Sequence, residues 1–583
     1  MLAPQKLKAQ TRAVIEASAL VLWQCLVRRQ PADRVLAAHL RGHKEFGSRD
    51  RRLISETVYA LFRWWGWLKP LAPAQFMARM EEAAAIADPA ANRTPLDIHA
   101  VIGGFRTEQW SPLLLGALVV EHIEAPDMAE WWGDACGLRL SDLGYCAAPQ
   151  RPVTRANRYF EVLAKSQKML ERAPASTDLT GTLKREIRAV AGMAPEPEDS
   201  KRPDLGLHQT VPAWVASETA LEPKAFQELL EWLQRRPPLW VRLQPKSTGV
   251  AVGPCDSVAV NADADRQTEG RASCPAMHES SASGERRART RTGAWASRPL
   301  SPGVPPGAEG KLPVGAPALP GNATRETILA ELAEAKLAPE PHPRLENAAA
   351  THNNRVNFYT LPAYSEGRVE IQDLASQCIG TVCAPAPGER WWDPCAGAGG
   401  KSLLLAQLMQ GKGVVIASDI REHKLEDLKK RARRGGFFNI TPKAWDGKPL
   451  PARKATYDGV LVDAPCSCSG TWRRNPAARW STAPAEVVEL AETQLQILKA
   501  AASGVKPGGV LVYATCSFFK RENEAVARAF AESAPEFELE PFPHPLTGEP
   551  TPGFAQFWPW EGDCDAMFAA RFRRKKAAAA GSD

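Results

Sequence analysis

Two cysteines, Cys466 and Cys516, each follow a short run of apolar, β-branched residues in this chain of 583 residues. Such runs are typical of buried parallel strands, and the carboxyl ends of parallel strands meet at the sheet edge where ligands bind. A thiolate is a strong nucleophile when a nearby charge or helix N-terminus lowers its pKa. A lone cysteine at a strand end usually fills the core, but two at one edge favour covalent chemistry.

A glycine-rich loop at 393–401 follows an earlier predicted strand and opens a helix. Its glycines permit a tight turn and a close approach of the backbone to a ligand. The spacing matches neither a P-loop nor a G-x-G-x-x-G dinucleotide loop. Asp419 ends the next predicted strand, where an acid can accept hydrogen bonds from two ribose hydroxyls. A strand-to-helix turn is the simpler alternative for the loop alone, but the order of loop and acid indicates a nucleoside cofactor.

The elements that must position these residues alternate between strands and helices from about residue 385 onward. Strands are expected at 414–418, 458–463 and 509–514, and helices at 402–409, 425–434 and 484–503. Such alternation predicts an α/β fold with a mostly parallel, doubly wound sheet.

The rest of the chain divides by composition and hydrophobic spacing. Apolar residues recur at helical spacing near the N-terminus, whereas the segment 247–323 has nine prolines and no apolar periodicity, a composition that predicts disorder. The predicted units are a helical lobe at 1–150, a helix and linker at 151–205, a small α/β unit at 206–246 plus 324–365, a disordered insertion at 247–323, a catalytic domain at 366–572 and a basic tail at 573–583.

Composition and charge narrow the class of protein. No apolar run is long enough for a transmembrane helix, and the first residues lack a secretory signal pattern, so we expect a cytoplasmic monomer without membrane contact. Twelve cysteines include no CxxC pair or Cys/His cluster of zinc spacing, so no metal is expected. Residues 1–70 carry thirteen Lys and Arg against five Asp and Glu, and 571–576 is a basic run. Both fit a phosphate-backbone partner, with a solvated face and a solubilising tail as the alternative.

Residues 369–570 resemble the Sun/Fmu, RsmB-like, family of RNA cytosine-carbon-5 methyltransferases. The segments that carry the resemblance are Glu370–Gln377, Cys395–Lys401, Asp419, Asp446, Asp463–Ser467, Thr515–Ser517 and Glu522–Glu524. Residues 1–70 resemble the NusB-like helical RNA-binding lobe of the bacterial members, through Ser48–Arg52 and Val58–Arg63. The resemblance implies a Rossmann-like S-adenosylmethionine-dependent methyltransferase sheet, an N-terminal all-α NusB-like lobe and a small α/β connecting unit.

The resemblance also implies a role for each candidate residue. Cys516 would be the nucleophile that adds to carbon-6 of cytosine, and Cys466 would help to release the product. Asp463 would hold the exocyclic amine and ring nitrogen of the base, which Lys401 would orient or polarise. The implied residues for binding S-adenosylmethionine are Cys395, Ala396, Gly397, Ala398, Gly399, Gly400, Lys401, Asp419, Asp446 and Asp463.

Four places depart from the family pattern without removing a catalytic group. Ala398 stands where proline is frequent, Lys424 stands where arginine is common, and residues 518–521 replace a stretch that contains proline. Cys468 stands where glycine is usual; it puts a third thiol near the site, and we interpret it as a small residue replacing glycine. Basic and aromatic residues at 472–476 and 479–480 are typical of RNA contacts, and the target cytosine is expected to be flipped or single-stranded.

The expected function is therefore 5-methylcytosine formation in RNA, with small-subunit ribosomal RNA favoured by the N-terminal lobe. A DNA cytosine methyltransferase is disfavoured by the second cysteine motif at 515–517. A transfer RNA cytosine-carbon-5 methyltransferase stays open. A non-catalytic rRNA-binding assembly factor is disfavoured by the presence of both Cys466 and Cys516.

Overall fold

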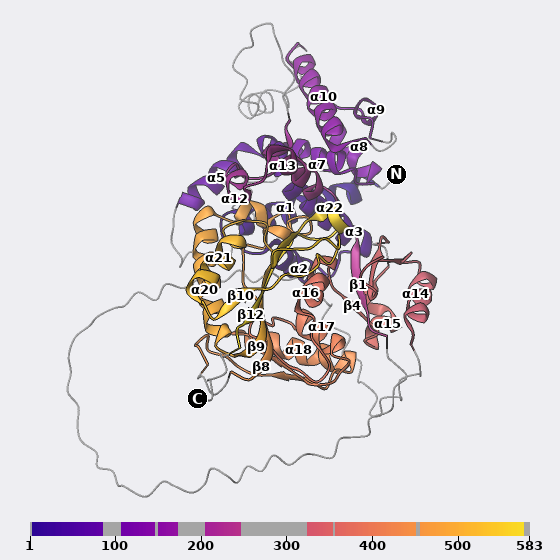
Figure 1. The fold of residues 1–583 in the computed structure, drawn as a ribbon. Coiled ribbons are helices and arrows are strands. Elements are labelled where there is room, and N and C mark those ends of the chain that lie inside the picture. Colours follow the sequence, from indigo (N-terminus) through magenta and orange to yellow (C-terminus); the bar gives the residue numbers. More distant parts are fainter. Residues whose placement is uncertain are drawn as a thin grey trace, which may run out of the picture.

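The computed structural model describes residues 3–85, 107–145, 150–172, 205–245, 323–353, 356–450 and 455–576. The predicted insertion lies outside the described residues except for its last residue, as do the final seven residues of the predicted tail. Figure 1 shows a helical N-terminal lobe above a large α/β domain, with a small sheet at one side of that domain. Within the described ranges, no helix combines the length and apolar character needed to cross a bilayer.

The N-terminal lobe is helical because its apolar residues recur every three to four positions and bury one common core. Its elements are α1 (Pro4–Leu26), α2 (Ala32–Gly42), α3 (Ser48–Arg63), α4 (Trp65–Leu68), η1 (Lys69–Leu71), α5 (Ala74–Ala85), α7 (Thr107–Glu121), α8 (Pro126–Ala135), α9 (Leu140–Leu143) and α10 (Pro152–Arg172). In α10, the hydroxyl of the buried Tyr159 donates a 2.6 Å hydrogen bond to the carbonyl of Pro112 in α7. The lobe therefore extends beyond the predicted boundary at residue 150.

The small sheet is antiparallel and has the strand order β2-β3-β1-β4. Its strands are β1 (Leu239–Leu243), β2 (Glu340–Pro341), β3 (Ala348–Thr351) and β4 (Val369–Ile371). Helices α14 (Arg325–Glu334) and α15 (Pro362–Ser365) bury Ile328, Leu332 and Ala363 against it. The short 3-10 helix η4 (Phe358–Thr360) precedes α15.

Two predicted boundaries of this unit are wrong. Strand β4 falls within the predicted catalytic domain, yet it pairs with β1 of the small sheet, with Glu370 opposite Arg242. The elements η3 (Leu207–Thr210), α12 (Val215–Thr219) and α13 (Pro223–Leu233) were predicted to belong to the small unit. They pack instead against the catalytic domain, where Leu230 and Phe519 share one core. The spacing of apolar residues predicts a helix or strand, but it does not predict which part of the protein that helix or strand packs against.

The large sheet has the strand order β10-β12-β9-β8-β5-β6-β7, with β11 paired to β12. Its strands are β5 (Arg390–Asp393), β6 (Val414–Ala417), β7 (Ile440–Pro442), β8 (Tyr457–Asp463), β9 (Val505–Thr515), β10 (Phe537–Leu539), β11 (Phe554–Phe557) and β12 (Met567–Arg574). The run from β9 to β7 is parallel, and β10, β11 and β12 pair antiparallel. The predicted mostly parallel sheet is confirmed.

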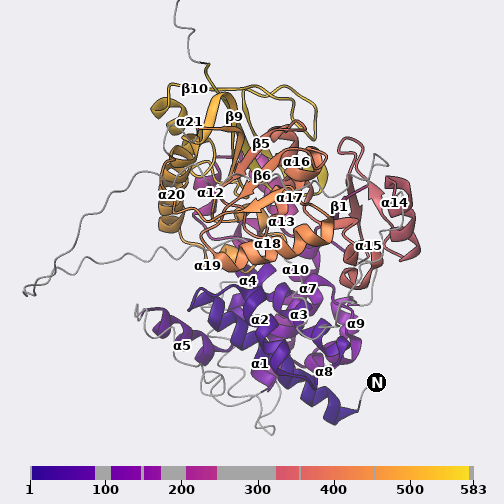
Figure 2. The same ribbon diagram turned by 90° about the horizontal axis from the view of Figure 1, so that it is seen from below.

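Helices cover both faces of this sheet, as a doubly wound fold requires. The helices of this domain are α16 (Leu374–Cys383), α17 (Gly400–Leu408), α18 (Glu422–Gly435), η6 (Ser469–Thr471), α19 (Ala478–Ser481), α20 (Pro484–Ala502), α21 (Glu524–Ser533) and α22 (Pro559–Gly562). Alternate residues of β9 enter separate cores: Val512 packs with residues of α16 and α17, and Tyr513 with residues of α20 and α21. Figure 2 shows these two helix pairs on opposite sides of the sheet.

The predicted basic tail is wrong at its start, because β12 continues to Arg574 and forms part of the sheet. Arg571 and Arg573 both pair with Glu540, at 2.7 and 2.5 Å. Arg574 donates a 2.5 Å hydrogen bond to the carbonyl of Val505. These guanidinium groups have protein partners, so they do not form the free cationic tail that the sequence predicted.

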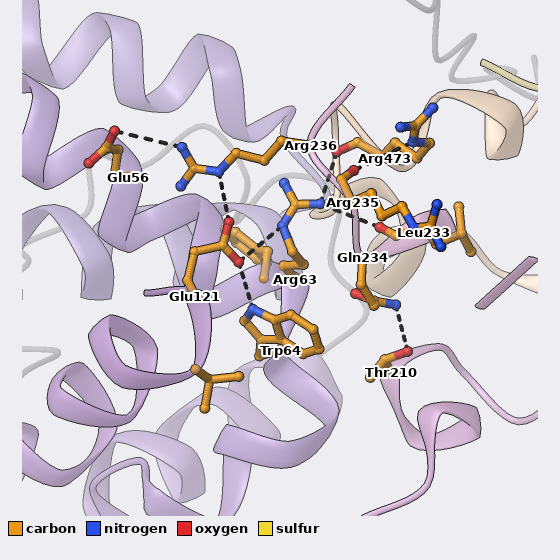
Figure 3. Close-up of polar contacts among 12 residues, drawn as sticks. Glu56, Arg63, Trp64, Glu121, Thr210, Leu233, Gln234, Arg235, Arg236 and Arg473 are labelled. Carbon is orange, nitrogen blue, oxygen red and sulfur yellow. Dashed lines mark hydrogen bonds and ion pairs between the residues drawn. The ribbon is translucent and has the colours of Figure 1, made fainter. Parts of the chain in front are cut away.

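A buried polar network joins the N-terminal lobe to the catalytic domain (Figure 3). Arg63, at the end of α3, is 4% exposed and donates to the carbonyls of Leu233 at 3.4 Å and Arg473 at 3.1 Å. Its Nε lies 3.4 Å from Glu121, which also accepts a 2.8 Å hydrogen bond from Arg236. The lobe is thereby fixed to the segment that follows the Cys466 motif.

Candidate active site

The two candidate cysteines meet at the carboxyl edge of two adjacent strands. Strands β8 and β9 are parallel with Asp463 opposite Ala514, so the residues that follow each strand emerge side by side. The Sγ atoms of Cys466 and Cys516 lie 3.3 Å apart. Cys466 is fully buried and Cys516 is partly exposed. The structure therefore unites two thiols that lie fifty residues apart in sequence, with one of them open to an approaching ligand.

A buried carboxylate ties the two cysteine loops together. Glu522 accepts hydrogen bonds from the Ser467 amide at 2.8 Å, the Ser467 hydroxyl at 2.5 Å and the Ser517 hydroxyl at 2.6 Å. Gln494 of α20 adds a fourth donor at 3.0 Å. Burial raises the pKa of Glu522, although these donors oppose the shift. Sequence reasoning did not assign this role, but the serine that follows each cysteine is a signal that could have indicated it.

Lys401 and Asp463 form an ion pair beside the thiols. Lys401 lies in the first turn of α17, and its Nζ donates to Oδ2 of Asp463, the last residue of β8, at 2.8 Å. Burial disfavours the ammonium, but the Asp463 carboxylate outweighs it, so the pKa of Lys401 is raised and the group is charged at neutral pH. Burial raises the pKa of Asp463 while Lys401 opposes that change. Both groups interact electrostatically with Cys516.

The glycine loop has the backbone that a close ligand approach requires. Gly399 has φ +85°, and a Cβ there would lie 2.6 Å from Cγ of Leu428, so no other residue fits without a shift. Gly397 has φ +54°, and a Cβ there would meet no atom within 4 Å, so this part of the loop borders open space. A nucleoside approaching the backbone at Gly397 is therefore sterically possible.

Asp419 is connected to this loop by a hydrogen bond. Its Oδ2 accepts a 2.9 Å hydrogen bond from the amide of Gly397. Arg421 donates to the same carboxylate from its backbone amide, Nε and Nη2, at 2.8 to 2.9 Å. Burial opposes ionisation, but the hydrogen bonds from Arg421 prevail and lower the pKa of Asp419. Sequence reasoning did not single out Arg421, although it follows Asp419 by two residues.

The remaining predicted cofactor residues differ in their placement. The amide of Ala396 donates to the Ser418 carbonyl at 2.8 Å, and the carbonyl of Ala398 accepts from Arg431 at 2.9 Å, so the loop is held from two sides. Burial raises the pKa of Cys395 well above its ordinary value. Asp446 has a side chain that is 64% exposed and pairs with Lys448 at 3.4 Å. Its predicted place near an adenine stays a prediction.

Cys468 lies beside the other two thiols. Its φ of +58° is in the left-handed region that favours glycine, which explains why the resemblance places glycine there. Its Sγ donates to the carbonyl of Cys466 at 3.0 Å.

The predicted RNA-contacting segment at 472–480 is largely internal. Trp472 is fully buried and meets the Phe518 ring edge-on at 5.3 Å between centroids. Arg479 is fully buried and donates to the carbonyl of Leu233 at 3.1 Å, and Arg474 pairs with Asp373 and Asp565. The prediction that these side chains contact RNA is wrong, because they connect parts of the protein.

A cleft of about 1200 Å³ lies between α2 and α3 of the lobe and the catalytic domain. Cationic or imidazole side chains on its walls come from both parts of the molecule: Arg34, His39, Arg41, Arg63, Arg236, His423, Lys424, Arg473 and Arg474. Asp33 and Glu56 are acidic residues on the same walls. The cleft therefore has an excess of basic groups.

Residues of the catalytic domain match a known family model and a group of named relatives. The model of the family described as 16S rRNA methyltransferase RsmB/F matches residues 380–573. Proteins named ribosomal RNA small subunit methyltransferase B from Salmonella typhi and Salmonella newport are each 34% identical over 261 residues. The match covers 43% of this chain and 57% of each relative, so the chain spans little more than half of their length.

A solved structure supports the fold across nearly the whole chain. The crystal structure of PH0851 is 20% identical, covers 98% of this chain and 100% of its own, and superposes with a TM-score of 0.58. A sequence identity of 20% means that this similarity supports the fold and not the function.

Proposed function

We propose that this chain, whose residues 380–573 match the family described as 16S rRNA methyltransferase RsmB/F, is an S-adenosylmethionine-dependent enzyme that forms 5-methylcytosine in small-subunit ribosomal RNA. One observation carries the proposal: Sγ of Cys466 and Sγ of Cys516 lie 3.3 Å apart at the carboxyl edge of β8 and β9. The Lys401–Asp463 pair next to them supplies a cation and a carboxylate for the base.

Cys516 is the attacking residue, and its surroundings support this assignment. It is partly exposed, whereas Cys466 is fully buried. Hydrogen bonds with Cys468 and Cys516, followed by burial, raise the pKa of Cys466 well above its ordinary value. Cys466 therefore keeps its proton at neutral pH. The ammonium of Lys401 favours a thiolate at Cys516, and the carboxylate of Asp463, which is paired with Lys401, opposes it.

The proposed reaction uses each cysteine once. Sγ of Cys516 adds to carbon-6 of cytosine, which makes carbon-5 nucleophilic enough to accept a methyl group. After methyl transfer, water takes the proton from carbon-5, the electron pair of that C–H bond forms the double bond between carbon-5 and carbon-6, and the bond from carbon-6 to Sγ of Cys516 breaks. Cys516 leaves as a thiolate, and the protonated thiol of Cys466, 3.3 Å away, assists the release by donating a hydrogen bond to it. Asp463 holds the amine and ring nitrogen, where a carboxyl with raised pKa can share a proton.

The glycine loop and Asp419 are suited to the cofactor. S-adenosylmethionine supplies an electrophilic methyl group when it is bound. The open space at Gly397 and the backbone turn at Gly399 leave room for it beside the loop. The carboxylate of Asp419 accepts one hydrogen bond from Gly397 and three from Arg421, which fill its lone-pair sites, so ribose hydroxyls would bind there by displacing donors of the Arg421 side chain. Cys395 to Lys401 form the rest of the proposed site.

The cleft between the lobe and the catalytic domain is the proposed path of the RNA. Its basic side chains, including the exposed Arg34 and Arg41, suit a phosphate backbone. The lobe is fixed to the segment after Cys466 through Arg63 and Arg473, so RNA held in the cleft stays in register with the thiols. The target cytosine must leave any base stack to reach them.

The test is methyl transfer from labelled S-adenosylmethionine to 16S rRNA taken from cells that lack this protein, with bisulfite sequencing to locate the product. Cys516→Ser should lose all detectable transfer, while Cys466→Ala should accumulate a protein–RNA adduct on a denaturing gel. Cys25→Ala, a buried cysteine of α1, serves as the control. Wild-type rates in Cys516→Ser would overturn the nucleophile, and product confined to transfer RNA would overturn the rRNA assignment.

A further inference from the structure

Three thiols, rather than two, converge at this edge of the sheet. The Sγ atoms of Cys466, Cys468 and Cys516 all lie within 4.8 Å of one another. We propose that they form a binding site for a thiophilic divalent cation of the Zn²⁺ class, with the fourth coordination position left to water. No metal was expected from the sequence, because the cysteines form no CxxC pair and no Cys/His cluster of zinc spacing.

The distances between the sulfurs suit such an ion. Thiolates bind Zn²⁺ at about 2.3 Å in a tetrahedral arrangement, which separates the sulfurs by about 3.8 Å. The separation between Cys466 and Cys516 is 3.3 Å, and the largest in the trio does not exceed 4.8 Å. Small rotations of the three side chains, which move each sulfur atom by no more than about one ångström, are enough to centre an ion among them.

Cys468 is the residue that makes this trio, and it does so in an unfavourable backbone conformation. Its φ of +58° would suit glycine better. A strained residue beside a reactive group supports a functional hypothesis. The strained turn directs the thiol toward Cys466, where Sγ donates to the carbonyl at 3.0 Å. A passive filler of the same space needs no sulfur.

The charges of the surroundings also fit. Binding displaces the thiol protons, because a metal ion coordinates thiolates. Three thiolates and a divalent cation leave one negative charge, and the ammonium of Lys401 lies close enough to interact with Cys516. Cys516 is partly exposed, which gives the ion a way in.

The consequence for catalysis rests on the proposed function. An ion bound to Cys516 occupies the lone pair that would attack carbon-6, so a bound metal blocks methyl transfer. Release of the ion by a chelator restores the thiolate. The binding itself does not depend on the proposed reaction, and it can be measured without RNA.

The experiment is a titration of the full chain with Co²⁺ in oxygen-free buffer that contains a phosphine reductant. Wild-type protein should bind one equivalent with a thiolate-to-cobalt charge-transfer band and the visible bands of a tetrahedral site, and Zn²⁺ should displace it. Cys468→Gly, which suits the backbone, should bind at least about tenfold more weakly, the scale of losing one contact at a metal site. Cys516→Ser should behave likewise, and Cys25→Ala should match wild type.

Two outcomes would overturn the proposal: wild type without a sulfur charge-transfer band, or Cys468→Gly that binds Co²⁺ as tightly as wild type. Inhibition by Zn²⁺ is then measured for wild type, Cys468→Gly and Cys25→Ala, each relative to its own activity in chelator, and Cys468→Gly should need at least about ten times more Zn²⁺. A protein that methylates RNA but binds no Co²⁺ refutes the metal site alone. A protein that binds Co²⁺ but methylates no RNA refutes the proposed function alone.

Discussion

Lys401 Nζ donates a 2.8 Å hydrogen bond to Asp463 Oδ2, which links the first turn of α17 to the end of β8. The pair joins the loop proposed for the cofactor to the strand that carries Cys466. Both partners are largely buried, with side chains 12% and 29% exposed. The geometry of the cofactor loop and that of the thiols therefore depend on each other.

Replacing Lys401 by Met should reduce the rate of methyl transfer by at least about tenfold. A tenfold loss corresponds to about 1.4 kcal/mol of lost interaction energy. It removes the cation next to Cys516 and leaves the Asp463 carboxylate unpaired. Alkylation of Cys516 by iodoacetamide at fixed pH, followed by mass spectrometry, should slow as well. Lys412→Met, at an exposed position just after α17, should leave both rates unchanged. Unaltered alkylation in Lys401→Met would contradict the proposed electrostatic role.

Replacing Glu522 by Ala should weaken both stability and catalysis. It leaves the Ser467 amide and the hydroxyls of Ser467 and Ser517 without their acceptor, at about 1–3 kcal/mol for each group left unsatisfied. Urea denaturation and the methylation assay measure the two effects. Glu524→Ala is the matched control, since Glu524 forms a surface pair with Arg528 worth about 0.5 kcal/mol. A folded Glu522→Ala protein with full activity would show that the carboxylate does not position the thiols.

Asp393 predicts a pH dependence of stability. Burial raises its pKa to about 7 despite the hydrogen bond from Ser402, while the unfolded value is about 3.9. The folded state therefore holds the proton more tightly, so stability from this group is complete below about pH 4 and is lost as the pH rises toward 7, by at most about 4 kcal/mol. Asp393→Asn should reduce this decline in urea denaturation between pH 4 and 7. Parallel profiles for the two proteins would contradict the shift.

Glu121→Gln should destabilise the contact between lobe and catalytic domain. The change leaves Arg63 buried without its counter-ion, a loss of about 3–5 kcal/mol for a broken buried pair. Glu161→Gln is the control, because Glu161 pairs with Lys165 on the surface at 45% and 70% exposure. A drop in melting temperature no larger than that of the control would show that Glu121 does not stabilise the interface.

Substitutions in the cleft and in β12 should separate RNA binding from folding. Arg41→Gln removes an exposed cation of the cleft, so the affinity for RNA should fall. The slope of the logarithm of the binding constant against the logarithm of the salt concentration should become shallower by about one unit. Arg573→Gln removes a residue paired with Glu540 and should lower stability without changing the salt slope. The reverse result would restore the basic tail as the RNA contact.

The sequence was sufficient to predict the strands, the helices and the loop that have a recognisable local pattern of residues. The apolar runs of β8 and β9 and the glycine loop gave the parallel sheet and the edge where Cys466 and Cys516 meet, because strand direction and helix alternation are local properties. The proximity of the thiols then follows from the adjacency of β8 and β9.

The pairing and burial of charged residues could not be predicted from the spacing of apolar residues. Arg573 and Arg479 look alike in sequence to solvent-exposed cations, yet one pairs with Glu540 and the other is fully buried. Strand β4 has three residues, and its partner is determined by the fold rather than by its composition. A third thiol near the site was expected at Cys468, but its distance from the other two sulfur atoms follows only from the fold.

The network at Arg63 has a consequence for the order of folding during synthesis. Glu121 follows Arg63 by 58 residues and α10 completes the core of the lobe soon afterwards, so the lobe can collapse early on the ribosome. The Arg473 carbonyl, however, is 410 residues further along the chain than Arg63. Until translation reaches it, the nascent lobe has a guanidinium that is only partly satisfied, and docking of the lobe must be among the last steps of maturation.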